Sequence, residues 1–384
     1  MKKITLILTI LILTLISCEQ SSSPEDDKPW SKTIGELPGR ATIILSTANN
    51  EYTVCGDVLN NNQDFCFFNL KEDGNLNWFK SYDRGYNDRI NSMLELENGD
   101  FIILGESDKD SLDTEGLILK INTIGDTLWT KIVDKGLKDQ LISIASTTDS
   151  CFIISGYSEV SGQYTDGSDA FLMKIDSDGN EIWFNKYDSG AWEKGSYVTQ
   201  KADGGYLLLC NIGESLLWII HTDSEGNKTW DKTITNNYCH INSVVQLENK
   251  NLVIAGYKPS VYDQYFCLLE INTNGDVQWY KTYEVPAWNK AYSMIKAKDE
   301  GYLLVGYTSY NSLGYSDSWI IKTDSQGNKV WDKIIGGTGA DVALSVKQLS
   351  NDNFLIAGWS SSFGSENVKP WLFKLDNSGN EIME

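Results

Sequence analysis

Two kinds of residue are scarce in this chain of 384 residues, and each scarcity excludes a class of function. The chain contains two histidines, His221 and His240, which excludes most histidine-based catalysis and any metal site built from several histidines. It has 32 basic residues against 53 acidic ones, a formal net charge of −21. Because binding of nucleic acid depends on Lys and Arg side chains that neutralise phosphates, this charge argues against a nucleic-acid partner. It also argues against electrostatic docking on anionic lipid.

Long hydrophobic runs are absent except at the amino terminus. Lys2 and Lys3 precede an apolar run over residues 4–16, which is shorter than the roughly 20 residues of a bilayer span. Residues 1–17 are therefore expected to be a signal peptide. The run ends in Leu15-Ile16-Ser17-Cys18, which resembles the lipobox of bacterial lipoproteins. The resemblance implies that Cys18 is acylated, palmitate included, and anchors the mature protein to the outer membrane; the alternative is an ordinary secretory peptide with a chance cysteine.

The segment after Cys18 is polar and acidic. It reads Ser21-Ser22-Ser23-Pro24-Glu25-Asp26-Asp27 and has too little apolar surface to form a core, so residues 18–29 are expected to be a flexible tether. An acidic run at this place resembles the surface-export signal of Bacteroidetes lipoproteins. Whether the domain faces the periplasm or the cell exterior stays open.

The rest of the chain is dominated by an internal repeat, which is sought before local structure. Tryptophans recur at intervals of 47 to 54 residues, at Trp30, Trp78, Trp129, Trp183, Trp230, Trp279 and Trp331. A glycine followed by Asn or Asp stands four residues before each of the last six, and a seventh such glycine occurs near the carboxyl terminus. These glycines are Gly74, Gly125, Gly179, Gly226, Gly275, Gly327 and Gly379.

Each repeat unit has the pattern of four short strands. In one unit the expected strands cover residues 90–96, 101–105, 117–121 and 128–133, with turns rich in Gly, Asn and Asp between them. Units of this kind repeated around an axis form a β-propeller. We therefore predict an all-β fold in which residues 30–384 form a single seven-bladed β-propeller with four-stranded blades. The last unit lacks its outer strand, and residues 30–35 match residues 331–336, so the amino-terminal strand is expected to close the last blade.

The turn Asp376-Asn377-Ser378-Gly379-Asn380, followed by a strand, resembles the repeats of secreted and lipid-anchored bacterial propellers. More distantly it is similar to quinoprotein repeats with a tryptophan-docking motif. The resemblance covers residues 30–384 and implies a fold, not an activity. The full docking signature of quinoprotein enzymes is absent, so no cofactor is expected.

The cysteines and the candidate catalytic groups fit structural roles better than chemical ones. Most of the cysteines after Cys18 occupy positions that are apolar in other repeats and are expected to be buried free thiols. Cys55 and Cys66, which flank one hairpin, are the only pair proposed for a disulfide test. His221 aligns with lysines of other repeats, and His240 has no recognisable nucleophile partner. A set of residues recurs at the entry to the first strand of a unit and is interpreted as repeat architecture: Asp88, Asp139, Glu193, Asn289 and Asp341. No metal site is predicted.

Aromatic residues are concentrated in the connections expected at one face of the propeller. The predicted ligand-binding residues are Tyr86, Trp192, Tyr238, Trp288, Tyr310, Tyr315 and Trp359. Aromatic platforms among polar side chains suit a glycan or a protein partner. The sequence therefore favours a monomeric, non-enzymatic binding or scaffolding protein of the cell envelope. The alternative is a carbohydrate-active hydrolase or lyase that uses acidic residues at the channel mouth.

Overall fold

The structure, a computed structural model, describes residues 30–34, 38–46, 51–60, 62–109, 113–159, 167–236, 238–363 and 368–383. The expected signal peptide, Cys18 and the tether lie outside the described residues. Within the described residues no helix is long and apolar enough to cross a membrane.

The described chain is all-β, with 28 strands in antiparallel four-stranded meanders. The first two meanders are β2 (Gly39–Ser46), β3 (Tyr52–Asn60), β4 (Asn62–Leu70), β5 (Leu76–Tyr82), and β6 (Asn87–Glu95), β7 (Phe101–Asp108), β8 (Thr114–Ile121), β9 (Thr127–Val133). The next two are β10 (Lys138–Ser146), β11 (Phe152–Glu159), β12 (Ser168–Ile175), β13 (Glu181–Tyr187), and β14 (Glu193–Gln200), β15 (Tyr206–Ile212), β16 (Leu216–Thr222), β17 (Lys228–Ile234). Then follow β18 (His240–Gln246), β19 (Leu252–Pro259), β20 (Gln264–Ile271), β21 (Val277–Tyr283), and β22 (Asn289–Lys296), β23 (Tyr302–Thr308), β24 (Asp317–Thr323), β25 (Lys329–Ile335). A single parallel pair, Lys138 with Thr114, joins the meanders β6–β9 and β10–β13 into one eight-stranded sheet.

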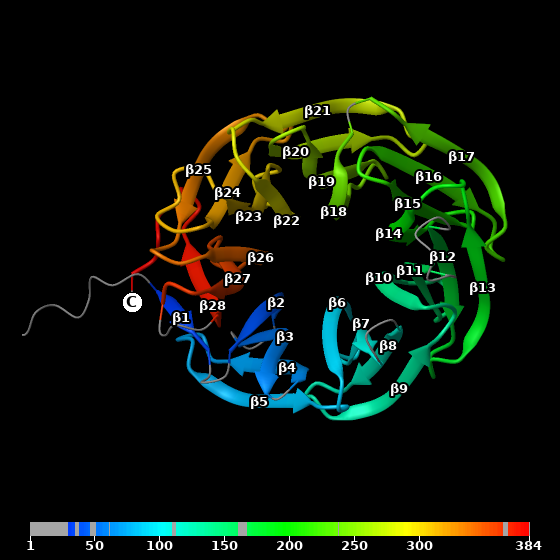
Figure 1. Cartoon of the computed structure of the whole chain (residues 1–384), viewed down its shortest axis with the longest axis horizontal. Helices are drawn as coiled ribbons and strands as arrows, with labels where there is room; N and C mark the ends of the chain where they lie inside the picture. Colours follow the sequence, from blue (N-terminus) through cyan, green and yellow to red (C-terminus); the bar gives the residue numbers. More distant parts are fainter. Residues whose placement is uncertain are drawn as a thin grey trace, which may run out of the picture.

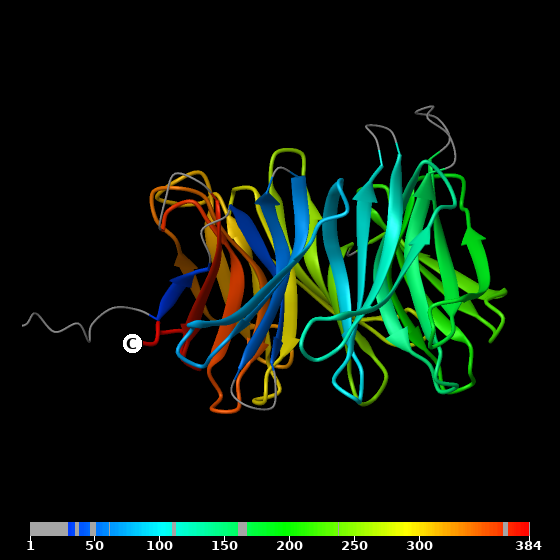
Figure 2. The ribbon, with the colours of Figure 1, turned by 90° about the horizontal axis from the view of Figure 1, so that it is seen from below.

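The last sheet combines the two ends of the chain. Strands β26 (Asp341–Gln348), β27 (Phe354–Ser360) and β28 (Lys369–Leu375) are completed by β1 (Ser31–Thr33), which pairs antiparallel with β28. The amino-terminal strand thus lies where the match between residues 30–35 and 331–336 predicts it. The sheets follow one another around a common centre, with the first strand of each meander innermost (Figure 1). Seen from the side, the connections gather at two opposite faces (Figure 2).

The hydrophobic core lies between neighbouring sheets. The second and third strands of each meander are buried on both faces, as in β7 and β24, so their sequences are nearly continuous apolar runs. One cluster packs Trp30 and Ile34 against Tyr52 and Val54 of β3 and against Leu355 of β27, so apolar contacts join the two ends of the chain. Burying this area supplies the main stabilisation of the fold.

The repeated Trp and Gly residues contact each other between neighbouring sheets. A Cβ atom on Gly379 would lie 2.9 Å from the Trp331 ring, and one on Gly226 would lie 2.7 Å from the Trp183 ring. Gly379 also has φ +81°, a conformation that favours glycine. The constant spacing between the repeated Trp and Gly residues therefore has two structural causes. The glycine forms a tight turn in one sheet, and a Trp ring from the preceding sheet covers that turn. Gly275 departs from this pattern, because Ile219 takes the place of the ring.

Candidate functional site

A cleft of about 640 Å³ lies beside the innermost strands β22, β26 and β2. These strands belong to three successive sheets around the centre (Figure 1). The side chains that shape it are Arg40, Trp288, Tyr292, Tyr307, Tyr315 and Trp359. We call these six residues and the space between them the aromatic cleft. It brings together Trp288, Tyr315 and Trp359 from the residues predicted for ligand binding.

Two connections and one strand contribute the predicted aromatics. Trp288 precedes β22 and is 57% exposed, while Tyr315 precedes β24 and is 89% exposed. The backbone of Trp288 is held by Ser309, whose N–H donates to the Trp288 carbonyl at 3.1 Å and whose Oγ accepts from the Trp288 N–H at 3.1 Å. Trp359 lies within β27 rather than in a loop and pairs with Val342. The exposed Trp288 is therefore held at its backbone, and both Trp288 and Tyr315 present exposed rings to a ligand.

Tyr292 and Tyr307 line the cleft but were not among the predicted residues, since both belong to strands. The register of β22 against β23 shifts between Ala291 and Ser293, so Tyr292 is a bulge residue. Its ring centroid lies 6.0 Å from that of Tyr307. Equivalent shifts occur in the other innermost strands, as in β26, where Leu344 is the bulge residue and also lines the cleft. The sequence signal that could have identified the bulge residues Tyr292 and Leu344 is a break in the two-residue alternation of apolar and polar side chains along each strand.

The cleft presents hydrogen-bond donors. Burial raises the pKa of Tyr292 to about 12, against the opposing effect of the Arg40 charge, and burial also raises the pKa of Tyr307. Both phenols therefore stay protonated at neutral pH. Arg40 forms an ion pair with Asp57, with Nη2 and Oδ1 2.9 Å apart, so its charge is largely compensated within its own sheet.

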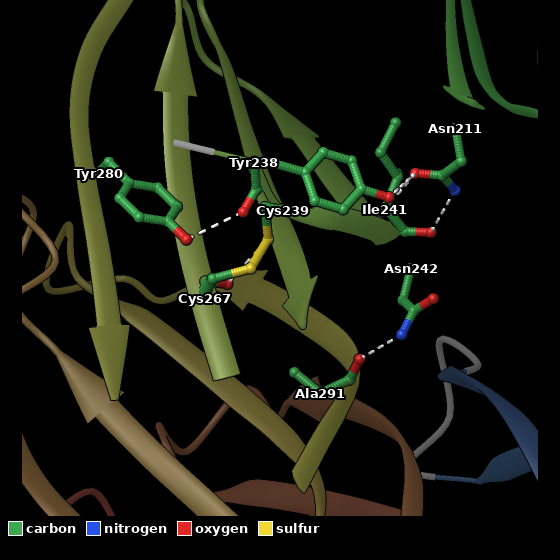
Figure 3. Close-up of a disulfide and its surroundings, with 8 residues drawn as sticks. All are labelled: Asn211, Tyr238, Cys239, Ile241, Asn242, Cys267, Tyr280 and Ala291. Atoms are coloured by element: carbon green, nitrogen blue, oxygen red, sulfur yellow. Dashed lines mark hydrogen bonds between the residues drawn. A yellow bond between two sulfur atoms is a disulfide. The ribbon is translucent and has the colours of Figure 1, made fainter. Parts of the chain in front are cut away.

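The other predicted ligand-binding residues do not line the cleft. Tyr86 and Trp192 are each 43% exposed, and Tyr310 is 41% exposed. Tyr238 is 7% exposed and packs in the core cluster between the sheets β14–β17 and β18–β21. Its hydroxyl donates to Oδ1 of Asn211 at 3.4 Å (Figure 3). Tyr238 is thus placed to brace two sheets rather than to contact a ligand.

At several of the strand entries the buried residue is engaged in local hydrogen bonds. Asp139 accepts from the N–H groups of Lys135 and Gly136, at 2.6 and 3.0 Å. Asn289 occupies the equivalent position but donates, from Nδ2 to the carbonyls of Gln264, Val285 and Ala287. A carboxylate in one unit and an amide in another thus both bind the backbone of a neighbouring connection. This agrees with the interpretation of these positions as repeat architecture. Burial raises the pKa of Asp139, and the N–H donors oppose this.

One group of acids could hold a cation. Single ligand atoms of Asp169, Asp188 and Glu193 lie within 4.8 Å of one another. Nζ of Lys186 lies 3.5 Å from Asp169 and supplies a positive charge to the group. Glu193 also accepts hydrogen bonds from Ser189 Oγ and from the Ala191 N–H. Some of the carboxylate oxygens in this group are thus already occupied by hydrogen bonds and an ion pair within the protein.

The cysteine predictions need one correction. Cys239 and Cys267 form a disulfide, so the expectation that Cys267 is a buried free thiol, and that Cys55 and Cys66 are the only pair to test, was wrong (Figure 3). Cys239 directly precedes His240. The equivalent positions in the other units are occupied by Gly39 and by the polar residues Asp88, Asp139, Glu193, Asn289 and Asp341. In this unit a covalent bond to β20 therefore takes the place of a buried polar side chain.

Cys55 and Cys66 are both free and buried. Cys55 pairs in register with Phe67 and Cys66 with Gly56, so the two side chains point to opposite faces of the same sheet. They accordingly belong to two different core clusters. This geometry excludes a disulfide between them.

Comparison with known proteins shows the fold without showing a family. No family model matches the sequence, and no curated protein matches it. Among solved structures, the chain is similar to the Neurospora crassa Pan2 WD40 domain, with 12% identity and a TM-score of 0.54 over 90% of this chain and 91% of that one. It is also similar to BBS1N in complex with ARL6DN, with 7% identity and a TM-score of 0.55 over 93% of this chain and 98% of that one.

A third similar structure is puromycin hydrolase, with 11% identity and a TM-score of 0.54. The match covers 88% of this chain but 52% of the hydrolase chain. At such identities the likeness establishes a β-propeller fold and nothing about activity.

Proposed function

We propose that the protein is a seven-bladed β-propeller, anchored to the outer membrane through a lipid on Cys18, that binds a glycan or protein partner without catalysing a reaction. The blade number is supported by the strand succession, since β2–β25 divide into consecutive meanders and β26–β28 need β1 to complete a four-stranded unit. The amino-terminal pattern of residues 1–29 supports export and acylation. The Cys239–Cys267 disulfide supports the same location, because disulfides persist in oxidising compartments.

The aromatic cleft is the observation on which the binding role rests. Large exposed rings cost solubility, and here Trp288 and Tyr315 are exposed around a concave space instead of being scattered singly. Flat rings for stacking, together with the phenols of Tyr292 and Tyr307 in the same cleft, suit the apolar face and the hydroxyl groups of a sugar. We infer that a carbohydrate is the ligand that fits best.

Two of the buried acids, Asp139 and Asp341, support a binding role over the alternative of a hydrolase or lyase. General acid–base work requires two carboxyl groups free to face a substrate. Asp139 and Asp341 instead accept hydrogen bonds from the backbone of the connections that precede their own strands. They are committed to holding those connections in place.

The binding role can be tested with a glycan array and a pair of variants. Trp288→Ala and Trp359→Ala should each abolish glycan binding while leaving the melting temperature within a few degrees of the wild type. Tyr86→Ala is the matched control, because Tyr86 is 43% exposed but lies outside the aromatic cleft. Glycan binding that survives both Trp substitutions would contradict the assignment of the cleft.

The anchoring and its orientation need separate measurements. Metabolic labelling with a clickable palmitate analogue should modify the wild type and not a Cys18→Ser variant. Protease treatment of intact cells should digest the domain if it faces the exterior and spare it if it faces the periplasm. Labelling of the Cys18→Ser variant would contradict the proposed anchor.

A further inference from the structure

Basic residues recur at one register position of the innermost strands, although the chain as a whole is strongly acidic. The position follows the buried entry residue and is occupied by Arg40, Arg89, Gln140, Lys194, His240, Lys290 and Val342. Because the register is the same in every unit, these side chains lie at the same height around the centre of the propeller. A protein with a formal net charge of −21 thus concentrates cationic side chains at one mouth of its central axis.

The charge at this position is compensated in some units and not in others. Arg40 is paired with Asp57, and Arg89 is paired with Glu106 and Asp108, each at 3.2 Å. The register partners of Lys194, His240 and Lys290 are Asn211, Tyr257 and Tyr307, none of which is a carboxylate. Among the ion pairs of the described residues none involves Lys194 or Lys290. We call Lys194, His240 and Lys290 the basic arc.

Aromatic rings hold the two lysines in place. Nζ of Lys194 lies 5.0 Å from the ring centroid of Tyr157, and Nζ of Lys290 lies 4.8 Å from that of Tyr257. In both cases the ring belongs to the preceding unit. A cation over an aromatic face is attracted to it but keeps its charge, so both ammonium groups remain able to bind an anion.

His240 lies between the two lysines in the order of the units. Its ring stacks on Tyr257 with centroids 4.6 Å apart and planes 17° apart. Burial lowers its pKa to about 4, Glu214 opposes this, and the charges of Lys194 and Lys290 lower it further. Both ammonium groups therefore act on the same imidazole, which is uncharged at neutral pH, so Lys194 and Lys290 carry the positive charge of the basic arc. Glu214, which accepts a hydrogen bond from Tyr257 at 3.2 Å, is the one carboxylate that acts on this imidazole.

The basic arc adjoins the aromatic cleft. Lys290 pairs in register with Tyr307, and Tyr307 lines the cleft. A ligand stacked on Trp288 or Tyr315 can therefore extend toward Lys290 and, further around the centre, toward Lys194. Two uncompensated ammonium groups beside aromatic platforms fit sugar rings that carry acidic groups.

Resting on the carbohydrate-binding function proposed above, we infer that the ligand is an acidic carbohydrate, whose sugar rings stack in the aromatic cleft and whose carboxylates bind Lys290 and Lys194. The acidic surface elsewhere on the protein repels such a ligand. The basic arc therefore selects where it binds as well as which sugar it is.

The test compares two sugars that differ only in charge. Trigalacturonate and its methyl ester have the same backbone, so calorimetric titration of the full-length protein with each isolates the contribution of the carboxylates. We expect trigalacturonate to bind at least tenfold more tightly than the ester, because a hydrogen bond between charged groups is worth roughly that factor. The preference should weaken as salt is added.

Variants then assign the preference to the basic arc. Lys290→Gln and Lys194→Gln should each reduce trigalacturonate affinity about tenfold and leave the affinity for the ester unchanged. Lys228→Gln is the matched control, because Nζ of Lys228 also lies over a ring, 5.3 Å from the centroid of Trp218, but on an outer strand. Its affinity for both sugars should equal that of the wild type.

The possible failures are distinguishable. If both sugars bind equally and Trp288→Ala weakens both, the carbohydrate-binding function stands and the role of the basic arc is refuted. If neither sugar binds but a poly-glutamate peptide does, in a manner lost in Lys290→Gln, the ligand is an acidic peptide and the carbohydrate assignment is refuted. If Lys228→Gln weakens trigalacturonate binding as much as Lys290→Gln does, general charge explains the preference and the basic arc does not.

Discussion

Removal of the Cys239–Cys267 disulfide should destabilise the protein by an amount that follows from the loop it closes. The two cysteines are 28 residues apart. Cross-linking a loop of that length lowers the entropy of the unfolded chain, which corresponds to about 3–4 kcal/mol of stability at 25 °C. For a domain of roughly 350 residues, this change in the free energy of unfolding lowers the melting temperature by about 5 °C.

The assay combines a double variant with a reducing agent. Cys239→Ala with Cys267→Ala should melt below the wild type, and dithiothreitol should lower the melting temperature of the wild type but not that of the variant. Cys66→Ala with Cys210→Ala serves as the control, because both residues are buried free thiols. Its stability should fall through lost packing alone, and it should remain as sensitive to the reducing agent as the wild type.

Two results would refute this reasoning. Peptide mapping without reduction would contradict the disulfide if it found Cys239 and Cys267 in separate peptides. A wild type whose melting temperature is unchanged by complete reduction would show that the cross-link does not stabilise the domain.

Two further perturbations test the packing and the electrostatics. Trp30→Ala should lower the free energy of unfolding by roughly 3–5 kcal/mol, because Trp30 is 6% exposed and Lys374 Nζ lies 3.8 Å from its ring centroid. Thermal denaturation measures this change. A loss of stability no larger than that of the exposed Trp192→Ala variant would contradict the prediction. His240→Gln should reduce the acid sensitivity of the protein. Because the folded-state pKa of His240 is lowered from 6.5 to about 4, the unfolded chain binds more protons between these values, so wild-type stability falls as pH falls through this window, by up to about 3 kcal/mol. Urea denaturation at pH 7 and pH 4.5 measures the free energy of unfolding of each protein. The prediction is contradicted if the wild type and the variant lose the same stability between the two pH values.

The repeat makes most of the fold predictable from the sequence, because the same packing requirement is imposed many times. A Trp that must cover the turn glycine of the next sheet, as Trp331 covers Gly379, appears in the sequence as a fixed spacing. The match between residues 30–35 and 331–336 likewise predicts the pairing of β1 with β28. Each of these signals depends on local sequence and on comparison between repeats.

Features that depend on the exact register were less accessible. Trp288 and Tyr315 were identified as candidate ligand-binding residues because they stand in long connections, whereas Tyr292 was missed because a bulge redirects it toward the cleft. The disulfide was missed because Cys267 was compared with apolar residues of other repeats, while Cys239 was not aligned with the buried residues at the strand entries. In each case a side chain's surroundings are set by the register of its strand against a partner strand.

Departures from the repeat are where this protein can acquire a specific function. A propeller whose units were identical would offer the same groups at every register position, and a ligand would have no reason to prefer one part of the ring. Here the position occupied by Arg40 and Arg89 is neutralised within its own sheet, while the equivalent Lys194 and Lys290 face only amide and phenol groups in register. The aromatic cleft lies beside the same part of the ring, since Tyr307, which lines the cleft, is the register partner of Lys290. That the two departures coincide is the structural reason to expect one ligand site, bound by stacking and by charge together.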